Sequence, residues 1–152
     1  MGTHSIIMGN LSKRFSRSEF ACPCGCGQDA VDYELIINLE SLADYFEQQE
    51  PNVSRVVVHI NSGNRCKAYD YQLKIDLGHD MSKPSKSQHL FNKASDFWME
   101  YVYSGKTQRK RIPDDLVADK LEELYPNKHG IGRYKGRTHY DTRTGPARWD
   151  NR

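Results

Sequence analysis

VDYELIINLESLADYFEQQEPNVSRVVVHINSG, residues 31–63, decides the fold class of this chain. Its first part predicts an amphipathic helix, because apolar side chains recur at helical spacing: Leu35, Leu39, Leu42 and Phe46. Asp32 supplies a candidate N-cap, and Pro51 lies just beyond the last turn. The second part, RVVVHINSG, is typical of a buried strand that ends in a turn at Gly63. A helix followed directly by a buried strand indicates helices packed on a sheet.

The rest of the chain alternates between helical and extended patterns. These patterns predict a short helix over 64–77, a polar loop over 78–88, a strand and hairpin arm over 93–105, a basic turn over 106–111, a second long helix over 112–126, and short strands over 130–134 and 137–143. The apolar stripe of the second long helix is assigned to Leu116, Leu121 and Leu124. We therefore expect an α+β fold with helices on a small antiparallel sheet, as a single domain over 1–152 with an N-terminal extension at 1–14.

The composition favours one ordinary domain and excludes several function classes. A chain of 152 residues with 37% hydrophobic residues can bury a modest core. The net charge of +2 is too small to indicate nucleic-acid binding, but it suits weak attraction to an acidic polymer such as a cell wall. No stretch approaches the roughly 20 apolar residues that cross a bilayer. Residues 1–15 lack the features of a signal peptide, and Ile6 breaks the myristoylation pattern, so we expect synthesis in the cytoplasm.

Cysteine spacing leaves three interpretations open. The four cysteines are Cys22, Cys24, Cys26 and Cys66, and the first three lie in CPCGCG. A zinc knuckle normally uses Cys-x-x-Cys, because two intervening residues let both sulfurs turn toward one ion. The spacing here is Cys-x-Cys-x-Cys, which signals a metal only weakly. Free thiols in a tight glycine-rich turn are the leading interpretation, with a disulfide, for example to Cys66, and a structural metal as alternatives.

A candidate metal site lies in the second half of the chain. A catalytic zinc needs three protein ligands from His and carboxylates, with one position open for water. SQHLFNKASDFW offers His89 on a loop and Asp96 at the start of a strand, and THYDTR offers His139 on a second strand. Side chains alternate along a strand, so His139 and Asp141 point to the same face. The spacing by itself is also compatible with a surface hydrogen-bonding pair.

Four motifs in the same order resemble the zinc D-Ala-D-Ala carboxypeptidase family, whose relatives include phage endolysins that cut peptidoglycan. They are EFACPCGCG at 19–27, SGNRC at 62–66, SQHLFNKASD at 87–96 and GIGRYKGRTHYD at 130–141, followed by ARW at 147–149. The family pattern reads Ser-Gly-Tyr-Arg, then Ser-x-His-x-x-Gly-x-Ala-x-Asp, then Val-His-Val-Asp. The resemblance covers about residues 15–149 and implies a fold like that of hedgehog and D-Ala-D-Ala peptidase domains.

The resemblance also implies roles for individual residues. His89, Asp96 and His139 match the zinc ligands of the family. Arg65 matches the arginine that faces the substrate carbonyl or carboxylate, a task that suits an always-charged, planar guanidinium. Ser87 matches a residue beside the ligand histidine that donates to the substrate or orients the turn.

Asp141 matches the aspartate after the final ligand, where it acts either as the general base or as a group that orients the ligand. Both roles stay open. The chain departs from the family pattern at Asn92, which replaces a glycine, and at Asn64, which replaces a tyrosine. Several relatives carry a catalytic Glu, Asp or His shortly before the last ligand, whereas YKGRT at 134–138 contains none of these.

The function implied is zinc-dependent hydrolysis of peptide bonds that involve D-amino acids in peptidoglycan, by carboxypeptidase or endopeptidase action. The partner is then the peptidoglycan stem peptide, and we expect a monomer. The absence of a signal peptide favours a phage-encoded lysis protein or virion component that acts on the cell wall. The alternatives are a non-catalytic cell-wall-binding or virion structural protein on the same fold, and a structural zinc protein built on CPCGCG.

Overall fold

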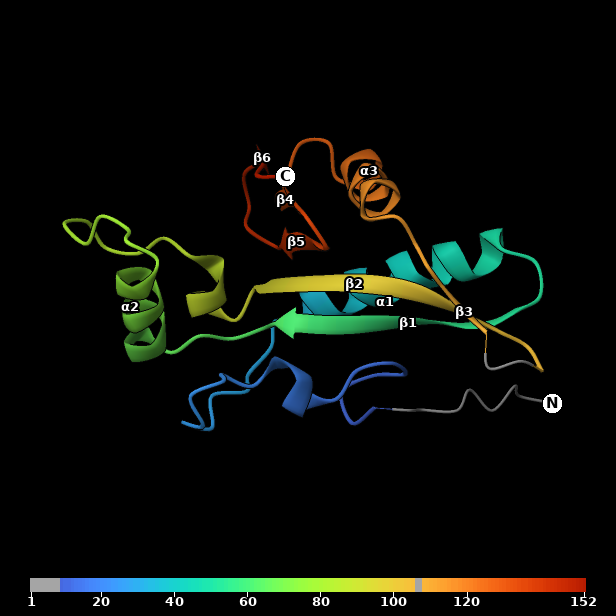
Figure 1. Ribbon diagram of the computed structural model, residues 1–152, viewed down its shortest axis with the longest axis horizontal. Helices are drawn as coiled ribbons and strands as arrows, with labels where there is room; N and C mark the ends of the chain where they lie inside the picture. Colours follow the sequence, from blue (N-terminus) through green and yellow to red (C-terminus); the bar gives the residue numbers. More distant parts are fainter. Residues whose placement is uncertain (1–8, 106–107) are drawn as a thin grey trace.

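The computed structural model describes residues 9–105 and 108–152 and arranges them as helices around one mixed sheet (Figure 1). The helices are α1 (Tyr33–Gln49), α2 (Lys67–Asp76) and α3 (Asp114–Leu124), with 3₁₀ turns η1 (Arg17–Phe20) and η2 (Gln88–Phe91). The strands are β1 (Val53–Ser62), β2 (Ala94–Tyr103), β3 (Arg109–Arg111), β4 (Gly130–Tyr134), β5 (Arg137–Asp141) and β6 (Ala147–Asp150). The α+β class is thus confirmed, and β3 occupies part of the segment predicted to be a basic turn.

The sheet has the strand order β1-β2-β5-β4-β6, with β3 paired to β2. All pairs except one are antiparallel, because β6 runs parallel to β4. The expectation of an antiparallel sheet is therefore wrong at this edge. The reason lies in residues 142–146, which carry the chain from the end of β5 past the start of β4. Backbone hydrogen bonds from His129 N–H to the Arg143 carbonyl and from Ala147 N–H to the His129 carbonyl hold this crossing in place.

Helix α1 follows the sequence pattern closely. It begins after Asp32, and all of its predicted core residues are buried. The Asp32 carboxylate does not cap the helix in the described structure, because it accepts a hydrogen bond from the Thr142 hydroxyl at 2.7 Å. The predicted N-cap position is confirmed, while its side chain ties the helix to the end of β5.

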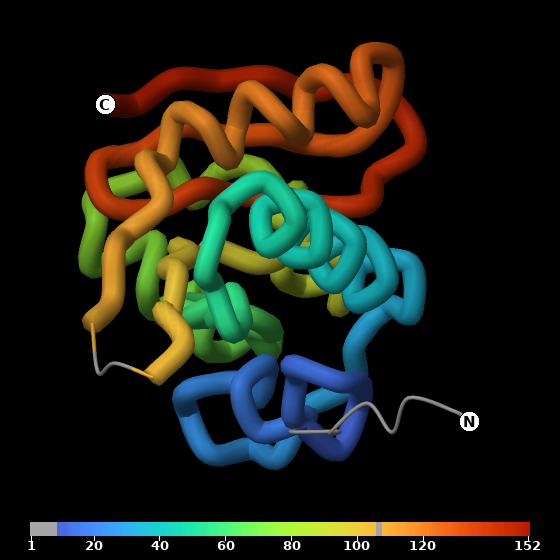
Figure 2. The backbone as a smooth tube through the Cα atoms, turned by 90° about the vertical axis from the view of Figure 1, so that its right-hand side faces the viewer, coloured from blue at the N-terminus to red at the C-terminus, as the bar shows by residue number. Residues whose placement is uncertain are grey.

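Helix α3 presents a different face from the predicted one. Leu121 is buried, together with Val117 and Ala118, but Leu116 and Leu124 are exposed. At about 100° per residue, Leu116 lies roughly 140° around the helix from Leu121, so the two cannot share one narrow stripe. The buried face packs on β4 and β5 within the same core as α1 (Figure 2). Lys120 of α3 lies over the Tyr45 ring of α1.

The segment before α1 contributes to the core. Phe15 and Phe20 are fully buried and contact each other edge to face. Arg14 falls within the predicted extension, yet its guanidinium lies 2.8 Å from Asp44 and 3.1 Å from Glu47 of α1. The predictions of no signal peptide and no myristoylation site depend mainly on residues 1–8. These residues lie outside the part of the chain that the structure describes. Within 9–105 and 108–152, no helix has the length and apolar character that a membrane span requires.

Candidate metal centre

Three elements bring their polar side chains together in a buried group. His89 comes from η2, Asp96 from β2 and His139 from β5. One potential ligand atom from each lies within 4.8 Å of the other two. Asp96 Oδ1 lies 2.9 Å from His139 Nδ1, and Asp96 Oδ2 lies 3.3 Å from His89 Nε2. The structure therefore joins the three residues that the sequence nominated as metal ligands.

Strand pairing and one tight turn produce this convergence. Asp96 and His139 are direct partners in the β2–β5 ladder, so their side chains leave the same face of the sheet. His89 reaches them because η2 ends at Asn92 in the left-handed conformation, with φ of 62°. Asn is among the commonest residues besides glycine to adopt this conformation, so Asn92 suits a position with positive φ.

Each histidine is oriented by a partner on its far nitrogen. His89 Nδ1 lies 2.5 Å from the Gly63 carbonyl oxygen, so Nδ1 donates to this carbonyl, and in the neutral ring the lone pair of Nε2 faces Asp96 and is available to a metal ion. His139 Nε2 lies 2.7 Å from Asp141 Oδ2, which leaves Nδ1 facing Asp96. Metal-binding histidines in proteins almost always have their second nitrogen hydrogen-bonded to a carbonyl or carboxylate in this way.

Asp141 has no exposed surface, and both of its carboxylate oxygens accept hydrogen bonds. Besides His139, its carboxylate accepts hydrogen bonds from the Gly130 N–H at 3.2 Å and from the Arg143 guanidinium at 2.7 Å to each oxygen. Gly130 leaves the space for this carboxylate, because a side chain there would collide with it. The donors hold Asp141 as an ionised, fixed acceptor for His139.

The electrostatics of the group favour a cation. Burial acts to raise the pKa of Asp96, but hydrogen bonds from His139 and His89 outweigh it and hold that pKa far below its usual value. Burial likewise opposes ionisation of Asp141, and His139 and Arg143 again lower its pKa. Burial acts to lower the pKa of His139, yet its bonds to Asp141 and Asp96 raise it. A metal ion at this point competes with that proton, so metal affinity should fall as the pH falls.

Trp149 of β6 forms a wall of the group that the sequence did not identify. Its ring centroid lies 4.8 Å from that of His139, and its indole N–H donates to the Tyr134 hydroxyl at 2.8 Å. Gly132 of β4 allows this position, because a side chain there would collide with the indole. The ARW motif contributes to the family resemblance, but no spacing rule identifies the parallel strand β6 that carries it.

The other two predicted site residues lie beside the group without a side-chain contact to it among the described residues. The Arg65 backbone N–H donates to the His89 carbonyl at 3.1 Å, but its guanidinium faces the buried Asp70 at 3.4 Å. Ser87 precedes η2 and accepts a backbone hydrogen bond from Leu90 N–H. Both residues are positioned at the loops that hold His89, and their predicted roles toward a substrate stay predictions.

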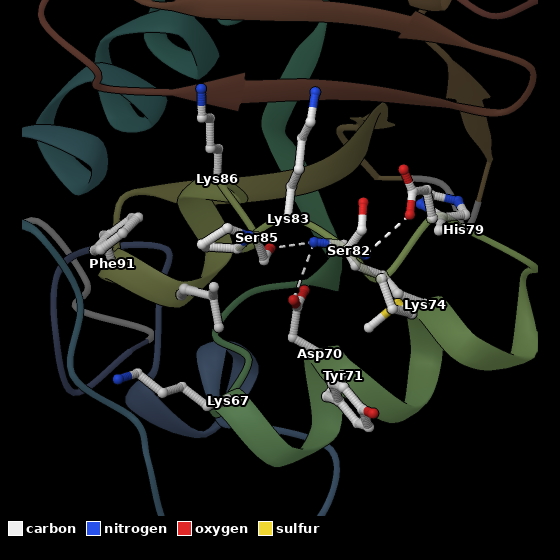
Figure 3. A pocket seen from close by; sticks show the side chains of 14 residues that line it. Lys67, Asp70, Tyr71, Lys74, His79, Ser82, Lys83, Ser85, Lys86 and Phe91 are labelled. Carbon is white, nitrogen blue, oxygen red and sulfur yellow. Dashed lines mark hydrogen bonds and ion pairs between the residues drawn. The ribbon is translucent and has the colours of Figure 1, made fainter.

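A hollow of about 840 Å³ lies next to the group, between α2 and the loop before η2 (Figure 3). Leu90 and Phe91, the two residues that follow His89 in the chain, line it, although the three candidate ligands do not. Asp70 binds Lys74 of the same helix at 3.0 Å, and Lys74 also contacts Ser85 across the hollow. Four lysines line it in all: Lys67, Lys74, Lys83 and Lys86. Its lining therefore has a positive character.

The remaining histidines of the described residues do not join the group. His59 stacks on Trp98 with ring centroids 4.0 Å apart and pairs with Glu100 at 2.9 Å, as expected for a satisfied strand residue. His79 is exposed on the loop. His129 lies in the loop directly before β4, where it is buried and hydrogen-bonded to the Tyr140 hydroxyl at 2.7 Å.

Comparison of the chain with protein-family models, with curated proteins and with solved structures finds no match.

Proposed function

We propose that this protein is a zinc-dependent peptidase that hydrolyses peptide bonds involving D-amino acids in bacterial peptidoglycan, on a fold of the D-Ala-D-Ala peptidase type. The observation that carries the proposal is the buried group of His89, Asp96 and His139, in which each histidine is oriented through its far nitrogen. Two imidazoles and one carboxylate are a donor set that zinc accepts, and three protein ligands leave a position for water. Zinc in such a site lowers the pKa of bound water toward about 7 and polarises a carbonyl.

Asp141 is best suited to orient His139. A general base must reach a water or substrate proton, and this carboxylate is fully buried and occupied by His139, Gly130 and Arg143. The same arrangement fixes the His139 ring with Nδ1 facing Asp96, where this nitrogen would bind the metal. Of the two roles that the sequence left open, the contacts favour the orienting one.

The substrate would bind at the loops beside α2. The Lys83 and Lys86 side chains extend away from α2 beside the hollow (Figure 3), where their ammonium groups suit the carboxylates of a stem peptide. Arg65 lies on the same side, since its backbone bonds to His89 and its guanidinium to Asp70 on the wall of the hollow. A substrate carboxylate or carbonyl would add to the acceptors of that guanidinium. We further propose that the protein acts as a monomer and is a phage lysin or virion component.

A second candidate function is supported by the same contacts. With Asp141 occupied and with neither carboxylate nor histidine in YKGRT, the residues around the final ligand offer no free base. A cell-wall-binding or virion structural protein could keep the metal group for stability alone. Such a protein would bind zinc and peptidoglycan but leave the peptide uncut.

Mass spectrometry of purified peptidoglycan fragments after incubation with protein and zinc separates the two functions. We expect the wild type to release D-alanine or shortened stem peptides, and His89→Ala to release none. His59→Gln is a matched control, because that histidine pairs with Glu100 outside the metal group and should leave the product pattern unchanged. Intact stem peptides with zinc-loaded wild type would overturn the peptidase and favour the structural role.

A further inference from the structure

All four cysteines of the chain converge at one place, although Cys66 is distant from the others in sequence. Cys22, Cys24 and Cys26 lie on the loop after η1, while Cys66 is the N-cap residue of α2. The four sulfurs all lie within 4.8 Å of one another. Cys24 Sγ is 3.4 Å from Cys22 Sγ and 3.6 Å from Cys66 Sγ.

These separations do not correspond to disulfides. A disulfide joins its sulfurs at about 2.05 Å, and all four cysteines are free thiols in the structure. Four thiolates around one zinc, each at about 2.3 Å, stand roughly 3.8 Å apart at the corners of a tetrahedron. The observed separations resemble the edges of that tetrahedron, and the number of sulfurs equals the number of ligands in a closed structural site.

Backbone conformation explains how cysteines spaced by single residues can face one point. Gly25 and Gly27 have φ of 81° and 86°, a region that residues with side chains rarely adopt. Gly25 turns the chain between Cys24 and Cys26, and Gly27 turns it directly after Cys26. Cys22 N–H donates to the Gln28 carbonyl at 2.9 Å and closes the loop on itself. A hydrogen bond from Gly25 N–H to the Cys22 carbonyl tightens the turn around Pro23 and Cys24, so cysteines separated by single residues can face one point without Cys-x-x-Cys spacing.

Backbone N–H groups also point at two of the sulfurs. Cys66 N–H donates to Cys22 Sγ at 3.3 Å, and Tyr69 N–H donates to Cys66 Sγ at 3.4 Å. Donors at the start of a helix stabilise a thiolate over a thiol, and the thiolate is the form that binds metal. The cluster thus has a preformed electrostatic preference for bound cations.

We propose that Cys22, Cys24, Cys26 and Cys66 hold a structural zinc ion, separate from the ion at His89, Asp96 and His139. It would fasten the loop after η1 to the first residue of α2. This junction directly follows Gly63 and Arg65, whose carbonyl and N–H contact His89. The structural ion would therefore stabilise the loop that orients a ligand of the other ion. The inference does not depend on the proposed peptidase function.

Cobalt substitution distinguishes the two sites, since only thiolate ligands give an intense thiolate-to-cobalt charge-transfer absorption. We expect purified wild type to contain two zinc ions per chain and its cobalt form to show this absorption. Cys24→Ser and Cys66→Ser should each lose one zinc and most of the absorption. His89→Ala, the matched control, should also lose one zinc but keep the absorption in full.

Measurements on the wild type alone can overturn the proposal, even if the cysteine variants do not fold. A cobalt-loaded wild type without thiolate absorption would exclude the site, as would disulfides in the unreduced protein by intact-mass analysis. Iron in place of zinc at the cysteines would contradict the assignment of the ion. Loss of peptidoglycan cleavage with the thiolate absorption retained would count against the proposed function and not against this site.

Discussion

Asp141 Oδ2 lies 2.7 Å from Nε2 of His139, whose other nitrogen, Nδ1, faces Asp96. This contact fixes the orientation of the His139 ring and, together with Arg143, keeps the fully buried Asp141 carboxylate ionised. Substitutions of Asp141 therefore test whether the orientation of His139 determines zinc affinity.

Asp141→Asn should weaken zinc binding by about 10- to 100-fold, because the amide orients His139 less strongly and pairs poorly with Arg143. Cleavage should return when zinc is added in excess. Zinc titration followed by activity measurements at limiting and saturating zinc checks this. Loss of turnover with zinc fully bound would instead identify Asp141 as the general base.

Gly130→Ala should also reduce zinc affinity, because the new methyl group would collide with the Asp141 carboxylate and displace it from His139. Gly145→Ala is the matched control, since no atom lies within 4 Å of a side chain there. Competition for zinc with a fluorescent chelator compares the two variants. Equal zinc affinity in both would contradict the close fit between Gly130 and Asp141.

Asp70→Asn tests the ion pairs beside the hollow. Burial opposes ionisation of Asp70, but Lys74, Ser85 and Arg65 lower its pKa below the usual value. A lowered folded-state pKa contributes stability above the unfolded pKa of about 4, and this contribution is lost as the pH falls through the folded value. The variant should lose roughly 1 to 3 kcal/mol at about pH 7, and the difference from wild type should shrink toward about pH 3.

Urea unfolding of Asp70→Asn across that pH range makes the comparison. Asp76→Asn on the exposed side of the same helix should change little at any pH. A deficit in Asp70→Asn that stays constant with pH would show that its cause is packing and not ionisation.

Arg65→Ala should retain zinc and lose about 100-fold or more in activity, as expected for a donor that contacts the reacting carbonyl or a substrate carboxylate. Arg65→Lys should rescue poorly, because lysine lacks the planar fork. Steady-state kinetics with measured zinc content checks both variants. Full activity in Arg65→Ala would show that Arg65 has no role in catalysis and serves only as the partner of Asp70.

The sequence predicted the parts of this structure that depend on local periodicity. Leu35, Leu39 and Leu42 identified α1, and strand alternation correctly placed His139 and Asp141 on one face. The sequence also nominated His89, Asp96 and His139, and the structure brings these residues together as a group that could hold a metal ion.

Features that depend on distant segments could not be predicted in the same way. Parallel pairing of β6 results from a crossing of the chain, so no pattern within Ala147–Asp150 encodes it. The Gly63 carbonyl that orients His89 carries no side-chain signal at all. The convergence of Cys66 with CPCGCG requires the fold itself, because about 40 residues separate them.

The most direct test is to measure the zinc content of the wild type, His89→Ala and His139→Ala by elemental analysis. We predict that each variant stays folded and loses one zinc ion per chain, because the core does not depend on this ion. Full wild-type zinc content in both folded variants would contradict the assignment of His89, Asp96 and His139 as the metal site.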